Sequence, residues 1–227
     1  MIRRVMRAFF SRMTIAAFLA LLLLAPGFAD AAEDAAGTVT RLKGSAVAMQ
    51  DAVPRPLKVG DKIQRGDVIS TGAGARLEIK MLDDAVMTLG EKTIFIVIDY
   101  VIGGNEPNAA MRLLQGAFSA VSGKIMKTAG AKFTVETEAA TIGIRGTTFW
   151  GGVLDGVFEL ALLDGQAVIV ENKAGRVVLD KVGEGTAIRA ADVAPTPPKK
   201  WGRQQGRARH RHGGVLGASS LHFTAPP

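Results

Sequence analysis

The residue of this sequence best placed to hold a ligand is an arginine that lies between two glycines. Arg145 occurs in the run Thr141-Ile142-Gly143-Ile144-Arg145-Gly146-Thr147. Glycine lets the backbone approach another group closely, and the guanidinium offers a planar fork of donors to a carboxylate or to backbone carbonyls. Two interpretations follow: Arg145 faces a ligand, or it clamps one segment of backbone to the next, because a buried cation must be paired. The candidate site residues, ligand-facing or structural, are Thr141, Gly143, Arg145, Gly146 and Thr147.

Acidic residues occur in several glycine-rich turns, where they could bind calcium. Four of them stand out: Asp61, Asp67, Asp83 and Asp84. Their spacing does not follow the oxygen-rich loop that a calcium site requires. Aspartate is common in turns because its side chain accepts hydrogen bonds from the nearby backbone. The sequence therefore predicts turn residues at these positions.

Histidine occurs only near the C-terminus, at His210, His212 and His222. His210 and His212 form a weak candidate metal site, because two imidazoles without a third ordered ligand bind a metal poorly. The favoured interpretation is a solvated basic segment. We expect neither a metal nor a cofactor.

The sequence carries no recognisable catalytic set. It has no cysteine, and no histidine precedes His210. The motifs of serine hydrolases, zinc proteases and phosphate-binding loops are absent. A carboxylate-based hydrolase is the least favoured alternative; its candidates, close in sequence, are Glu136, Glu138, Asp155 and Glu159. We therefore expect a protein that is not an enzyme.

The elements that must position these residues are short strands. Residues 76–81, 132–136 and 156–160 alternate polar and apolar side chains, which puts one set on a buried face and the other in water. Residues 93–98 are almost wholly apolar, as in a strand buried on both faces. Glycine-containing turns separate the runs. This pattern predicts an all-β, single compact domain.

The first 31 residues have the three parts of a secretory signal peptide. Four arginines precede an uncharged apolar run at residues 13–25, and the small residues Ala29 and Ala31 mark the expected cleavage region. The run is shorter than the roughly 20 residues that span a bilayer. We expect an exported, periplasmic protein, with a flexible leader at residues 32–36.

The chain's basic character is concentrated at its two ends. The net charge is +7, yet residues 13–194 carry a net charge of −3. Residues 194–227 are dense in Pro, Gly, Lys and Arg, so we expect a disordered tail. Its cations should bind anionic surfaces weakly and in a salt-dependent way, without specific recognition of nucleic acid. These cations are Lys199, Lys200, Arg203, Arg207, Arg209 and Arg211.

Several segments, taken in order, resemble the FecR domain family. The most specific is residues 133–149, where FTVET is followed by AATIGIRGTTF; it is similar to the family's F-x-V-x-T-P-x-A-x-x-G-V-R-G-T-x-F signature. Residues 66–72, 114–118 and 163–168 match further steps. Glu138 stands where the family usually has proline, which makes that turn less rigid. The resemblance covers about residues 37–190, and we place the domain at residues 37–193.

The resemblance implies a β-solenoid-like or rolled sheet, whereas spacing alone would equally allow a β-sandwich. It is a resemblance to stand-alone exported members, without the helical domain and transmembrane helix of the family's anti-sigma regulators. We expect a binding or scaffold module that recognises an envelope protein or polymer. The alternative is a component of envelope signalling that acts through a separate membrane partner.

Overall fold

A computed structural model describes residues 34–104 and 106–201. The expected signal peptide and most of the basic tail lie outside these residues. Within the described ranges, no helix is long and apolar enough to cross a membrane. One short 3-10 helix, η2 (Lys124–Lys127), interrupts the strands. The strands are β1 (Ala35–Lys43), β2 (Ala46–Gln50), β3 (Val53–Pro56), β4 (Lys62–Gln64), β5 (Val68–Thr71), β6 (Arg76–Met81), β7 (Val86–Leu89), β8 (Ile94–Val101), β9 (Asn108–Gln115), β10 (Ala117–Val121), β11 (Lys132–Glu136), β12 (Thr141–Leu154), β13 (Val157–Asn172), β14 (Gly175–Leu179), β15 (Glu184–Ile188) and β16 (Lys199–Lys200).

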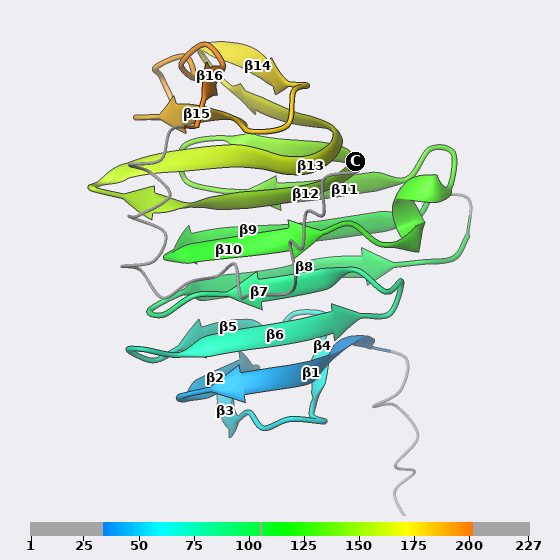
Figure 1. Ribbon diagram of the computed structural model, residues 1–227. Helices are drawn as coiled ribbons and strands as arrows, with labels where there is room; N and C mark the ends of the chain where they lie inside the picture. The colour runs from blue at the N-terminus through cyan, green and yellow to red at the C-terminus, as the bar shows by residue number, and fades with distance from the viewer. Residues whose placement is uncertain (1–33, 105, 202–227) are drawn as a thin grey trace, which may run out of the picture. The chain divides into compact units, whose positions relative to one another are not determined.

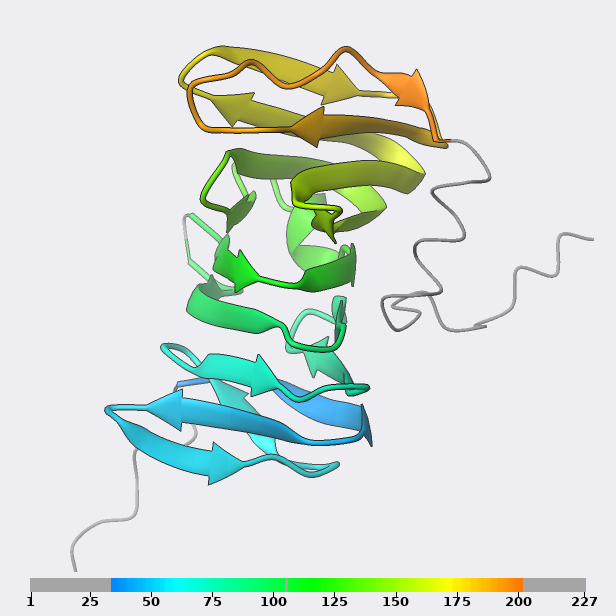
Figure 2. The ribbon, with the colours of Figure 1, turned by 90° about the vertical axis from the view of Figure 1, so that its left-hand side faces the viewer.

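All sixteen strands belong to one rolled sheet, which confirms the predicted all-β, solenoid-like class. The sheet has two walls that rise side by side (Figures 1 and 2). The first wall is β3-β2-β5-β8-β9-β11, and the second is β4-β1-β6-β7-β10. Every pairing is antiparallel except that of β9 with β11. Since each wall buries one face, alternate side chains point into the space between the walls.

The long strands β12 and β13 join the two walls. The start of β12 pairs with β11 of the first wall, and its later part pairs with β10 of the second. β13 pairs with β12 along its length. The later part of β13 also pairs with β14 on the first wall, and its earlier part pairs with β15 on the second wall. The bend lies where Thr147 pairs with Gly165, whose φ is +98°. One hairpin therefore serves both walls.

Aromatic rings fill the space between the walls. Phe95 on β8 packs against Phe118 on β10, with ring centroids 5.7 Å apart. Phe118 also contacts Phe149 edge to face at 5.4 Å, and Phe149 contacts Phe133 at 6.4 Å. Along the chain, these rings come alternately from the first and the second wall. Because they all point into the space between the walls, apolar residues recur at every second position of their strands.

One expectation about the first wall is wrong. β8 is not buried on both faces: its side chains alternate, and Ile98 is 40% exposed. Residues 108–115 form strand β9. β9 lies between antiparallel β8 and parallel β11, and this non-local pairing is what decides its conformation.

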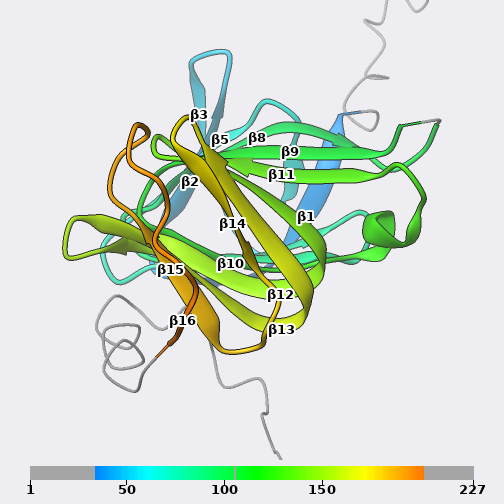
Figure 3. The ribbon, with the colours of Figure 1, turned by 90° about the horizontal axis from the view of Figure 1, so that it is seen from above.

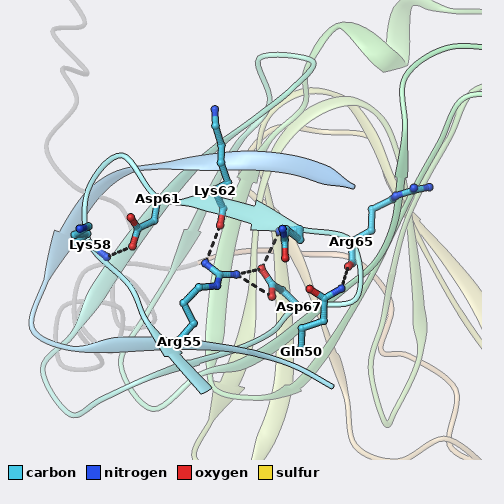
Figure 4. A network of polar contacts seen from close by, with 8 residues as sticks. Gln50, Arg55, Lys58, Asp61, Lys62, Arg65 and Asp67 are labelled. Atoms are coloured by element: carbon cyan, nitrogen blue, oxygen red, sulfur yellow. Dashed lines mark hydrogen bonds and ion pairs between the residues drawn. The ribbon is translucent and has the colours of Figure 1, made fainter. Parts of the chain in front are cut away.

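The N-terminal end of the stack is fastened by Arg55 (Figure 4). Its guanidinium donates to the Lys62 carbonyl at 2.9 Å and to both carboxylate oxygens of Asp67, at 2.8 and 3.1 Å. Asp67 is fully buried and also accepts from the backbone N–H of Gln64 at 2.8 Å. Arg55 on β3 thus ties one wall's terminal strand to β4, the terminal strand of the other.

A second buried carboxylate, Asp83, holds the turn between β6 and β7 against β8 and η2. It accepts hydrogen bonds from the Tyr100 hydroxyl and from the backbone N–H groups of Ala85 and Ile125, both at 3.0 Å. Its own carbonyl accepts from the Lys124 N–H at 2.8 Å. Burial, with Asp83 beside it, raises the pKa of Tyr100 well above its ordinary value of 10.

We expect Tyr100 to stay protonated in the folded protein at alkaline pH. A folded-state pKa above the unfolded one adds stability below pH 10 that is lost as pH rises further. Tyr100 is the chain's only tyrosine, so phenolate absorbance reports this residue alone. Titration should show no ionisation near pH 10 until the chain unfolds. An ordinary reversible titration in a folded sample would contradict the buried Tyr100–Asp83 contact.

The strands continue past the expected boundary at Val193. Lys199 and Lys200 form β16 and pair with Gly185 and Glu184 of β15. The Thr196 carbonyl accepts from the Thr186 hydroxyl at 2.7 Å. Trp201 packs on Trp150 with ring centroids 5.2 Å apart. Composition did not reveal these contacts, because two threonines and one tryptophan suffice to attach a segment otherwise rich in Pro and Lys.

Candidate functional site

The strongest motif of the sequence forms strand β12, and its side chains divide between two environments. Ile142 and Ile144 point into the core. Thr141 and Gly143, at alternate positions, lie on the outer face of the first wall. The apolar half of the motif therefore builds the core, and the small residues between shape an outer surface.

This outer surface is hollowed into an open groove of about 780 Å³. The groove crosses β11, β12, β13 and β14. Its lining includes Thr134, Thr141, Gly143, Ile169, Glu171 and Arg176.

The floor of the groove is formed by Thr134, Gly143 and Ile169, which belong to one row of residues that runs across the strands. Ala110 on β9 is opposite Thr134 on β11, which is opposite Gly143. Gly143 is opposite Ile169 on β13, and that residue pairs with Val178 on β14. A Cβ atom added at Gly143 would meet no atom within 4 Å. Packing within the chain therefore does not require glycine at position 143. The absence of a side chain at Gly143 leaves the groove open above this strand.

A second row carries charges of both signs along one side of the floor. Arg112 donates to Glu136 at 2.9 Å, and Glu136 pairs across the strands with Thr141. Glu171 and Arg176 follow in the same row on β13 and β14. A partner in the groove can therefore meet a hydroxyl, a carboxylate and a guanidinium within one row.

The rim at one end of the groove is the loop between β11 and β12. Thr137 closes it: its hydroxyl donates to the Ala140 carbonyl at 2.8 Å and accepts from the Ala140 N–H at 3.0 Å. These bonds hold the turn that contains Glu138 in place of the usual proline. Beyond the rim lies a second hollow of about 310 Å³, whose lining includes the exposed apolar residues Leu114 and Val153.

The structure separates the five candidate site residues. Thr141 and Gly143 line the groove, whereas Arg145, Gly146 and Thr147 lie at the bend of the β12–β13 hairpin. Arg145 is exposed, and its side chain makes no hydrogen bond or ion pair with any residue that the structure describes. The clamp interpretation requires such a partner. Thr147 is buried, and its hydroxyl has no hydrogen-bond partner within the same residues.

The four aspartates act in turns, as predicted. Asp61 accepts from the Lys58 N–H at 2.9 Å, and Asp67 and Asp83 accept from backbone as described above. Asp84 is exposed and forms ion pairs with Lys80, at 2.8 Å, and with Lys124. These pairs, Lys124 first, lower the pKa of Asp84 to about 2.

The four carboxylates considered for hydrolysis do not share a site. Glu136 and Glu138 belong to the first wall and its rim. Asp155 and Glu159 lie at the tip of the β12–β13 hairpin and in the part of β13 that pairs with β15. Burial, with Asp155 nearby, raises the pKa of Glu159.

The residues of the basic tail are only partly described. Lys199 and Lys200 are exposed on β16. Arg203, Arg207, Arg209, Arg211, His210 and His212 lie outside the described residues. Within the described part of the chain, no three His, Asp or Glu side chains gather as metal ligands.

Sequence reasoning missed the half of the groove that β13 and β14 supply. Ile169 belongs to the run Ala167-Val168-Ile169-Val170, which shows no polar alternation. Its outward direction follows only from its pairing with Gly143. A register between residues 141–145 and 167–171 would have been needed to find it.

Comparison with known proteins gives a family match and solved structures for this chain. A family model described as FecR protein matches residues 67–168. Two crystal structures of a "putative anti-sigma factor" from Parabacteroides distasonis ATCC 8503 are similar in fold. One has a TM-score of 0.50 at 17% identity over 63% of each chain, and the other a TM-score of 0.49 at 17% identity over 62% of each. The match thus spans less than two thirds of those chains. No curated protein matches the sequence.

Proposed function

We propose that this chain, whose residues 67–168 match a family model described as FecR protein, is a non-catalytic binding module that recognises an envelope protein or polymer through the groove on its first wall. The observation that carries the proposal is Gly143, which no intramolecular contact requires and which keeps the groove floor open. The groove is also lined by the outward-facing residues of the family's most specific segment. The same strand therefore contributes one face to the core and the other face to the groove.

The shape of the groove favours an extended occupant. Its floor crosses neighbouring strands that lie about 4.8 Å apart. The lining residues Thr134, Gly143, Ile169 and Arg176 lie on four neighbouring strands, a length of roughly 14 Å. An extended peptide or a linear polymer fits such a floor, with charges of both signs along one edge.

The expected export of the chain indicates the cell compartment in which the groove would bind its ligand. Residues 1–31 have the layout of a signal peptide, and we propose that the β domain works in the periplasm. The basic residues after Trp201 would add weak, salt-dependent attraction to anionic envelope material.

We expect Gly143→Trp to block the groove without unfolding the domain. An indole at this position enters open space above the floor, so the free energy of unfolding should change by no more than about 0.5 kcal/mol. Gly103→Trp is the matched control: this glycine also has no atom within 4 Å of an added Cβ, and it lies in the β8–β9 loop away from the groove. Thermal unfolding of both variants checks the stability.

Binding is measured by photo-crosslinking in the cell. A photoreactive residue at Thr134 samples the groove, and one at Val121 samples the outer face of the second wall. We expect adducts from position 134 that fall at least about tenfold in Gly143→Trp and persist in Gly103→Trp. Adducts that form equally from both positions, or that survive Gly143→Trp, would count against a groove-binding role. A variant without the basic tail should be truncated after Trp201, because β16 belongs to the domain.

A signalling component is the second candidate. The FecR domain and the fold shared with a protein titled a putative anti-sigma factor favour it. An adduct with an integral membrane protein from position 134 would support signalling. An adduct with a soluble protein or a polymer would support the scaffold role.

A further inference from the structure

The four terminal strands of the two walls differ in how they are protected against pairing with another chain. β3 contains Pro54 and Pro56, and Arg55 bonds it to β4. β16 consists of two exposed lysines. Proline and lysine are common means of discouraging edge-to-edge association. β14, with the sequence GRVVL, has neither.

The outer edge of β14 is open over most of its length. β14 pairs only with β13, and no other backbone hydrogen bond reaches residues 175–179 within the described chain. The returning segment before β16 lies beside the first residue of β14, where a Cβ at Gly175 would be 3.2 Å from Ala194. Val178, in the middle of the strand, is 41% exposed. Figure 3 shows β14 uppermost when the stack is seen from above.

The side chains of this edge are complementary to themselves. In an antiparallel pair centred on Val178, residue 176 of one copy lies opposite residue 180 of the other. Those residues are Arg176 and Asp180, both exposed. Neither makes an ion pair with another residue of the described chain. The same register places Val177, which packs at the margin of the core, opposite the buried Leu179.

We propose that β14 is a homodimer interface at which two copies of the chain join their first walls in one continuous sheet. The outward face of the junction carries two Arg176–Asp180 pairs on either side of Val178, and the inward face covers Val177. A two-fold interface of this kind uses one patch twice. Arg176 also lines the groove, so the test below measures self-association of the chain alone, with no groove ligand present.

A charge exchange tests the register. The full chain is studied by sedimentation over a range of concentrations at low salt. Arg176→Asp and Asp180→Arg each replace two opposite-charge pairs with like-charge pairs, so each should weaken the dimer at least about tenfold. The double variant restores both pairs and should recover the dissociation constant to within a few-fold. Failure of the double variant to recover would overturn the proposed register.

Two further variants guard against effects on folding. Val178→Lys places two cations face to face at the centre and should give a monomer, while Val121→Lys, at a site 44% exposed on β10, should leave the dimer intact. Circular dichroism verifies that both are folded. Since the chain has no cysteine, Val178→Cys should oxidise to a single dimeric species. A full chain that stays monomeric at every concentration, or a dimer that Val178→Lys does not disrupt, would refute the interface.

Discussion

Replacing Asp83 with asparagine should lower the free energy of unfolding by about 3 kcal/mol. The two carboxylate oxygens of Asp83 accept from the Tyr100 hydroxyl and from the N–H groups of Ala85 and Ile125. An amide of the same shape keeps one acceptor and turns the other into a donor. One N–H is then buried opposite a second donor, and the site is only 2% exposed, so water cannot relieve the conflict.

The neighbouring residue provides the control for this change. Asp84 makes ion pairs with Lys80 and Lys124 but is exposed, so Asp84→Asn should have a much smaller effect. Asparagine also suits its φ of +67°. Thermal and denaturant unfolding of both variants measures the difference. Equal losses of stability would show that the charge of this turn matters and that the buried hydrogen bonds of Asp83 do not.

Gly165→Ala should be the most damaging single methyl group in the domain, with a loss of at least about 4 kcal/mol or failure to fold. A Cβ at this position would lie 2.2 Å from the Gly146 carbonyl oxygen and 2.7 Å from the Thr147 Cα. Both are backbone atoms, which cannot move aside by changing rotamer. The φ of +98° adds strain. The substitution therefore forces apart β12 and β13 where the hairpin turns from one wall to the other.

Two other glycines of the same hairpin separate the causes. Gly146 has a φ of +58° but no atom within 4 Å of an added Cβ, so Gly146→Ala should cost about 1 kcal/mol through backbone strain. Gly143 has neither constraint, and Gly143→Ala should change stability by less than about 0.5 kcal/mol. Chemical denaturation ranks the three variants. A Gly165→Ala protein as stable as Gly143→Ala would mean that the hairpin does not bend as described.

Local pattern was sufficient for the strands that alternate. Residues 76–81 and 132–136 were expected as strands and are β6 and β11 with the same limits. Partners distant in sequence decided the rest. β9 takes its conformation from β8 and from the parallel strand β11, which begins 24 residues later. β16 depends on β15 and on one tryptophan contact.

The site followed the same division. The run at residues 141–147 was recognisable from its glycines and arginine, yet its residues lie in two different parts of the structure. Gly143 lies in the groove, while Arg145 lies at the bend, exposed. The spacing of two residues could not show that the strand turns from one wall to the other between them. Nor could it place Ile169 and Arg176, which reach the groove through β13 and β14.

The order of strands in the sheet bears on how the chain assembles. Each wall runs from its N-terminal strands to the shared hairpin in nearly the order of the sequence: β2, β5, β8, β9 and β11 on one side, and β1, β6, β7 and β10 on the other. If the chain folds from its N-terminus, these strands form one after another, and each pairs with a strand that is already in place. Each strand contacts only its neighbours in the stack, as the units of repeat proteins do. The β12–β13 hairpin, which joins both walls, then folds after the strands that it connects.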